Sequence, residues 1–178
     1  SEETAIGVFR GAGTQNNGKW LGDAIIGESN QKNSQKVAKH IYDQLLACTD
    51  QGQLPVVNIQ GFSRGAYSAL LVNKYLHELI NDGKTDKEKR LAHMPLNINI
   101  TANDPTPGPG CEHTSGVIVD EPAPHVTSEI DVYYAMNHTS GGLHNLSGTF
   151  FISESMNQAL LSLLNTNENQ RLKLHIGA

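Results

Sequence analysis

The sequence predicts an α/β fold, a three-layer sandwich in which helices cover both faces of a mostly parallel sheet. Two observations predict it. Short apolar runs rich in strand-forming residues alternate with longer segments whose apolar residues recur at helical spacing. One strand also ends in a glycine-rich turn that leads straight into a helix. With 178 residues, the chain has the length of one domain, and we expect residues 1–178 to form it.

The first half of the chain predicts two strands and two helices. Residues 5–9 are a short apolar run typical of a strand, and a loop rich in glycine and asparagine follows. Ser34 is expected to cap a helix that ends near residues 49–52. Residues 54–60 predict a buried strand, and a second helix is expected over residues 66–80.

The second half predicts further strands and one helix. Residues 96–102 alternate between apolar and polar side chains, as strands do, and an Asn-Asp-Pro sequence ends the run. We expect other strands at residues 117–119, 130–136 and 172–176, and a helix capped by Ser153 before the last of them. In an open parallel sheet, ligands bind at the loops that leave the carboxyl ends of the strands.

Composition and charge exclude several classes of protein. Lys and Arg number 13 against 18 Asp and Glu, a net charge of −5, which is wrong for a protein that neutralises nucleic-acid phosphates. The apolar fraction of 38% is too high for a disordered chain. No apolar stretch reaches the roughly 18 residues of a membrane span, and no signal peptide is visible. The charged run 84–90 is expected as a solvated loop or an exposed helical turn.

The cysteines indicate no disulfide framework and no metal site. Cys48 and Cys111 are expected as reduced thiols of a cytoplasmic protein. Cys111-Glu112-His113 is a single cluster without a second pair at ligand spacing, so no metal or cofactor is expected.

Residues 61–65, Gly-Phe-Ser-Arg-Gly, fit the G-x-S-x-G pattern of a nucleophile elbow. In such an elbow, a serine sits on a strained turn between a strand and a helix, and its hydroxyl projects above the sheet. The predicted strand before Ser63 and the predicted helix after it supply that context. We expect side chains at positions 61 and 65 to collide across the turn, so that both must be glycine. The alternative is a tight turn with an idle serine.

Three segments resemble a branch of the α/β-hydrolases that includes phospholipase effectors of bacterial secretion systems. Residues 61–66, G-F-S-R-G-A, are similar to the elbow of this branch, residues 13–16, G-T-Q-N, to its G-T-x-N loop, and residues 142–148, G-L-H-N-L-S-G, to its G-x-H-x-x-x-G segment. The chain departs from the pattern at Gly11-Ala12, where the branch carries an Asp, and at residues 100–104, I-T-A-N-D, where the branch has a strand that ends in W-D-T. The resemblance implies a minimal α/β-hydrolase, and the few remaining residues leave no room for a large lid.

A serine nucleophile needs an imidazole base to take its proton. The resemblance assigns this base to His144, and the glycines before it give its loop freedom. His138 is the alternative. His40 and His77 fall on predicted helices and are expected at helix surfaces.

The imidazole needs a carboxylate to hold its tautomer, and in α/β-hydrolases the chain order is serine, acid, histidine. Asp104 directly follows a predicted strand and is the expected acid, with Asp120 as the alternative. The oxyanion hole is expected from the backbone N–H of Arg64 and from the loop after the first strand, at Gly13 and Thr14.

The sequence therefore predicts a serine hydrolase that cleaves carboxylic esters through an acyl-enzyme on Ser63. The resemblance implies a lipid or phospholipid substrate, and either a cytoplasmic location or delivery by a secretion system into a target cell. Because the chain is short for this fold, we expect it to be one domain of a longer protein. No nucleic-acid partner is expected, and the sequence identifies no protein partner.

Two alternatives remain at this point. The first is a domain of the same fold without activity that binds a partner. The second is a nucleotide-binding loop, because residues 13–19 also fit G-x-x-x-x-G-K. Trp20 argues against that loop, since a phosphate-binding loop carries Ser or Thr there to bind Mg²⁺.

Overall fold

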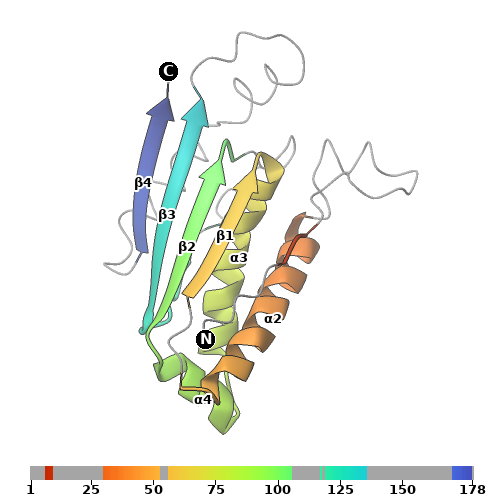
Figure 1. Ribbon diagram of the computed structural model, residues 1–178, viewed down its shortest axis with the longest axis vertical. Helices are drawn as coiled ribbons and strands as arrows, with labels where there is room; N and C mark the ends of the chain where they lie inside the picture. Colours follow the sequence, from red (N-terminus) through yellow and green to blue (C-terminus); the bar gives the residue numbers. More distant parts are fainter. Residues whose placement is uncertain are drawn as a thin grey trace, which may run out of the picture.

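A four-stranded parallel sheet forms the centre of the computed structural model, which describes residues 7–9, 30–52, 56–105, 117, 119–135 and 170–177. The strands lie in the order β1-β2-β3-β4, and every neighbouring pair is parallel (Figure 1). The expected α/β fold with a parallel sheet is therefore confirmed. The elements are α2 (Asn30–Thr49), β1 (Val56–Phe62), α3 (Arg64–Asn81), α4 (Asp86–His93), β2 (Leu96–Asn103), β3 (Val126–Ala135) and β4 (Gln170–Gly177).

The two faces of the sheet differ in character because apolar and polar residues alternate along the strands. Ile98 and Ile100 on β2, with Ile130 on β3, are buried on the face that α3 covers. On the opposite face, Asn99 donates a hydrogen bond to Asn58 at 3.0 Å. The last predicted helix, capped by Ser153, lies outside the described residues.

Helix α3 packs on β1 and β2, and α2 packs on α3 (Figure 1). Helix α2 begins at Asn30, so the expectation that Ser34 caps it is wrong. Ser34 is instead 1% exposed, one turn before Ala38, which is also buried. A small serine fits this position because it faces the core and not the start of the helix.

Helix α4 occupies the charged run after α3. Thr85 caps it through a capping box, in which its side chain accepts from the Glu88 N–H while the Glu88 carboxylate accepts from the Thr85 N–H. The backbone N–H groups of Thr85 and Lys84 hold the pKa of Glu88 below its usual value. Leu91 is the only buried residue of this helix, so the run forms an exposed helical segment.

Two short predicted strands are wrong where the structure describes them. Gly7–Phe9 form no strand, and the Phe9 ring meets the His40 ring edge-on at 5.7 Å on α2. Val117 and Val119 also lie outside the strands, yet each is at most 2% exposed. Val117 and Val119 are apolar because their side chains are buried, although neither residue belongs to a strand. Among the described helices, none combines the length and the apolar character that a membrane span requires.

Candidate active site at the carboxyl edge of the sheet

Ser63 is the single residue between the end of β1 and the start of α3. Its backbone has φ 55° and ψ −119°, a left-handed conformation that costs energy for a residue with a side chain. Its N–H donates to the Asn103 carbonyl of β2 at 2.8 Å, and its own carbonyl accepts from Ala66 and Tyr67 of α3. The strand beside it and the helix after it thus hold Ser63 in this strained conformation.

The hydroxyl of Ser63 is not used to cap the helix that it precedes. Serine at this position usually accepts a hydrogen bond from the first turn. Within the described part of the chain, the Ser63 side chain makes no such bond. The side chain is partly exposed, so it is accessible from solvent at the edge of the sheet.

The turn requires glycine at one of the two motif positions. A Cβ at Gly61 would lie 2.2 Å from the carbonyl oxygen of Gly65 and 2.7 Å from the nitrogen of Ala66. A Cβ at Gly65 would meet none of the described atoms within 4 Å outside its immediate surroundings. The expectation that both positions are glycine for the same steric reason is therefore wrong: the collision is built into position 61 only.

Asp104 lies beside Ser63 on the neighbouring strand. The register pairs Phe62 with Asn103, so Ser63 and Asp104 are each the first residue past their strands, at the same edge. Neighbouring strands lie about 4.8 Å apart. Asp104 has φ 49° and donates its N–H to the Tyr133 carbonyl of β3 at 2.7 Å.

Among the described residues, Ser63 and Asp104 are the only non-glycine residues with positive φ. Such strain persists where surrounding structure enforces it, and it concentrates at functional sites. Both side chains are partly exposed. The arrangement therefore places a hydroxyl and a carboxylate on adjoining strained turns at one accessible edge.

The alternative acid, Asp120, lies at the other end of the sheet. Its neighbour Glu121 accepts a hydrogen bond from Asn81, the last residue of α3, at 2.7 Å. Helix α3 has 18 residues and starts next to Ser63, so at about 1.5 Å per residue it separates the two ends by roughly 27 Å. Asp120 is thus remote from Ser63 in this structure.

Of the remaining predicted site residues, only Arg64 lies among those that the structure describes. His144, His138, Gly13 and Thr14 lie outside the described residues, as does the alternative phosphate loop 13–19. Arg64 is the first residue of α3, directly after Ser63, as the motif requires.

The described histidines lie elsewhere. His77, expected at a helix surface, is instead fully buried in the core. His175, which the sequence motifs do not indicate, donates from Nε2 to the Asp131 carboxylate at 2.8 Å and stacks on the Tyr133 ring at 4.3 Å. Its strand β4 is three strands from β1, which is about 14 Å. Asp131 and Tyr133 are two residues apart on β3, so their side chains lie on the same face of the sheet. This spacing is the sequence signal that could have indicated the contacts with His175.

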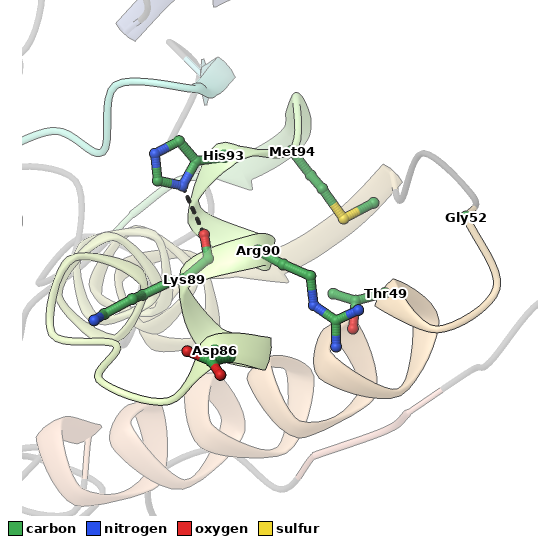
Figure 2. A pocket seen from close by; sticks show the side chains of 7 residues that line it. All are labelled: Thr49, Gly52, Asp86, Lys89, Arg90, His93 and Met94. Atoms are coloured by element: carbon green, nitrogen blue, oxygen red, sulfur yellow. Dashed lines mark hydrogen bonds between the residues drawn. The ribbon is translucent and has the colours of Figure 1, made fainter.

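A hollow of about 560 Å³ opens at the opposite end of the molecule, between the end of α2 and α4 (Figure 2). Within it, the His93 ring nitrogen Nδ1 donates to the carbonyl of Lys89 at 2.7 Å. Its wall is charged and holds no nucleophile in a strained turn; it is lined by Thr49, Gly52, Asp86, Lys89, Arg90, His93 and Met94. This hollow is therefore separate from the predicted site.

Within the described ranges, no group of three or more histidine, cysteine, aspartate or glutamate side chains is arranged to hold a metal ion. Comparison of the chain with protein-family models, with curated proteins and with solved structures found no match.

Proposed function

We propose that the protein is a serine hydrolase that cleaves carboxylic esters through an acyl-enzyme on Ser63. The observation that carries the proposal is the left-handed turn at Ser63, held between β1 and α3 by the Asn103 carbonyl. A turn of this kind raises a side chain above the sheet and places it at the amino end of a helix. The strained Asp104 on the adjoining strand is a second support.

In the proposed reaction, the Ser63 Oγ attacks the ester carbonyl while His144 takes its proton. The tetrahedral intermediate then collapses, and His144 gives that proton to the departing alcohol. His144 then takes a proton from water as the water attacks the acyl-enzyme. The second tetrahedral intermediate collapses, which releases the carboxylic acid, and His144 returns the proton to the Ser63 Oγ. Asp104 orients His144 throughout.

The Ser63 N–H is already bonded to Asn103, so it is not the oxyanion donor in this proposal. The donors are the backbone N–H of Arg64, which follows the nucleophile, and N–H groups of Gly13 and Thr14. The likeness of residues 61–66 to the elbow of phospholipase effectors further suggests a lipid or phospholipid ester as substrate.

A fluorophosphonate probe tests the proposal, because it phosphonylates only a serine that a neighbouring base activates. We expect the wild type to be labelled and Ser63→Ala not to be. Ser68→Ala is the matched control: this serine lies on α3, one turn further along, and its hydroxyl donates to Asn30 at 3.4 Å. Equal labelling of wild type and Ser63→Ala would contradict the proposal.

The same assay assigns the base and the acid. His144→Ala is expected to abolish labelling and His138→Ala to preserve it, while Asp104→Asn is expected to slow it more than Asp120→Asn. Folding of each variant is checked by circular dichroism. An unlabelled but folded wild type would favour the inactive binding domain, and stabilisation by ATP or GTP would favour the phosphate loop.

A further inference from the structure

Four polar side chains form a network in the core at the end of the sheet away from Ser63. Asn73 and His77 come from α3, Ser128 from the start of β3 and Gln170 from the start of β4. None of the four is more than 3% exposed, and His77 and Ser128 are at 0%. Polar groups are costly in a core unless they are bonded, so this network has to be satisfied internally.

The hydrogen bonds determine where the His77 ring carries its proton. The backbone N–H of Ala123 donates to Nδ1 at 3.0 Å, so Nδ1 holds a lone pair and the neutral ring carries hydrogen on Nε2. The Nε2–H donates to the Ser128 Oγ at 3.0 Å, and the Ser128 hydroxyl donates to the Asn73 Oδ1 at 2.7 Å. The Gln170 amide nitrogen lies 3.1 Å from the same Nε2, where both atoms are donors, and Gln170 is bonded into the network through its Oε1, which accepts from the Asn73 amide at 3.3 Å.

A second proton on the ring has no acceptor in this arrangement. It would have to sit on Nδ1, where it would face the N–H of Ala123. The groups that face the ring are uncharged on every element: Asn73 on α3, Ser128 on β3, Gln170 on β4 and the amide of Ala123.

The nearest charged side chains on these elements point elsewhere. Lys74 and Glu78 of α3 pair with each other at 3.9 Å, and Glu129 of β3 pairs with Arg171 of β4 at 3.6 Å on the opposite face of the sheet. Asp120, Glu121 and His125, on the segment before β3, are exposed to solvent. Among the described residues, no carboxylate compensates a cation on this ring, and burial lowers the pKa of His77 to about 4.

We propose that this network is an acid-sensitive latch: protonation of His77 releases β4 and the segment 119–125 from α3, while β1, β2 and α3 remain folded. The imidazole holds the segment 119–125 directly through the Ala123 amide, and it holds β4 indirectly, through Ser128 and then Asn73, whose amide bonds Gln170. Strand β4 lies at the edge of the described sheet away from α3 (Figure 1), and within 170–175, where its burial is described, only Gln170 and Leu172 are buried. Local opening of such a strand costs less free energy than global unfolding.

Amide hydrogen exchange of the whole chain, expressed as protection factors, tests the latch. In the open state, His77 regains its ordinary pKa of about 6.5, so lowering the pH from 7 to 5 raises the population of that state about twentyfold. We expect protection of β4 and of the Ala123 amide to fall by about this factor, and that of β1 and β2 to fall by less than threefold. A uniform fall over all strands, or none in β4, would overturn the proposal.

His77→Gln removes the titrating group, so it is expected to abolish the pH dependence of β4 protection. His125→Gln is the matched control, because it removes an exposed histidine from the same segment and is expected to leave that dependence unchanged. If His77→Gln does not fold, NMR of the wild-type protein with isotope-labelled histidine tests the latch instead, because it reports the tautomer and the titration of His77. The Nε2–H tautomer at pH 7 with titration well below pH 6 supports the latch, and an Nδ1–H tautomer or titration near 6.5 refutes it.

Discussion

The steric difference between Gly61 and Gly65 leads to a direct test of the turn at Ser63. In Gly61→Ala, the new Cβ would lie 2.2 Å from the Gly65 oxygen and 2.4 Å from its carbonyl carbon. Non-bonded heavy atoms are comfortable at about 3.5 Å or more. The atoms in the way belong to the backbone of the first turn of α3, so no side-chain rotation can relieve the collision.

The two substitutions are expected to change the free energy of unfolding in opposite directions. Overpacking of this kind costs about 1–3 kcal/mol, and the rigidity of the two flanking elements places Gly61→Ala at the upper end of that range. Gly65 lies in the helix with no described atom near its Cβ position, so Gly65→Ala is expected to stabilise by about 0.5–1 kcal/mol through lower entropy of the unfolded chain. The two variants should therefore differ by about 3.5–4 kcal/mol.

Urea unfolding followed by far-ultraviolet circular dichroism measures this difference, with equal m-values as the check that the two transitions are comparable. In thermal unfolding, the same difference corresponds to about 7–16 °C for a chain of this size. Equal stability of the two variants, or a Gly61→Ala protein as stable as the wild type, would refute the steric account of the elbow.

Two further predictions concern stability alone. Burial lowers the pKa of His77 in the folded state to about 4, so the neutral ring stabilises the fold fully above pH 6.5. As the pH falls toward 4, the free energy of unfolding is expected to drop by about 3 kcal/mol, measured by urea titration at each pH. A free energy of unfolding that stays constant over this pH range in the wild type would contradict the prediction. Thr85→Ala removes half of the capping box of α4 and is expected to cost about 1 kcal/mol, measured against Thr127→Ala on the polar face of the sheet; equal losses would show that the cap adds nothing.

Much of the fold could be predicted from the sequence because local pattern and tertiary role coincide there. The alternation in residues 96–102 corresponds to the buried and polar faces of β2, which extends to Asn103. The second predicted helix, 66–80, lies within α3, and the strand expected at 54–60 is observed as Val56–Phe62, although it is not the buried strand that was expected, since only Val57 of its residues is buried. Prediction failed at Ser34 because a capping serine and a buried small residue look alike in sequence.

The candidate site was predictable in part for a similar reason. The strand and helix around Ser63 are adjacent in sequence, and parallel strands bring the ends of β1 and β2 to one edge, which places Asp104. The burial of His77 could not be anticipated, because its partners Ser128 and Gln170 are 51 and 93 residues away along the chain. Pattern analysis on one helix treats such a histidine as a surface residue.

The ladder of the sheet continues one residue beyond the strands, from Ser63 to Asn103 and from Asp104 to Tyr133. The separation of the hydroxyl and the carboxylate is thereby a property of the β-sheet scaffold, set by strand spacing and twist. Substitution or insertion in the chain segment that follows Pro105 would therefore leave the backbone positions of this pair at the same mutual distance. Such a scaffold can change the residues around this edge without altering the spacing of Ser63 and Asp104.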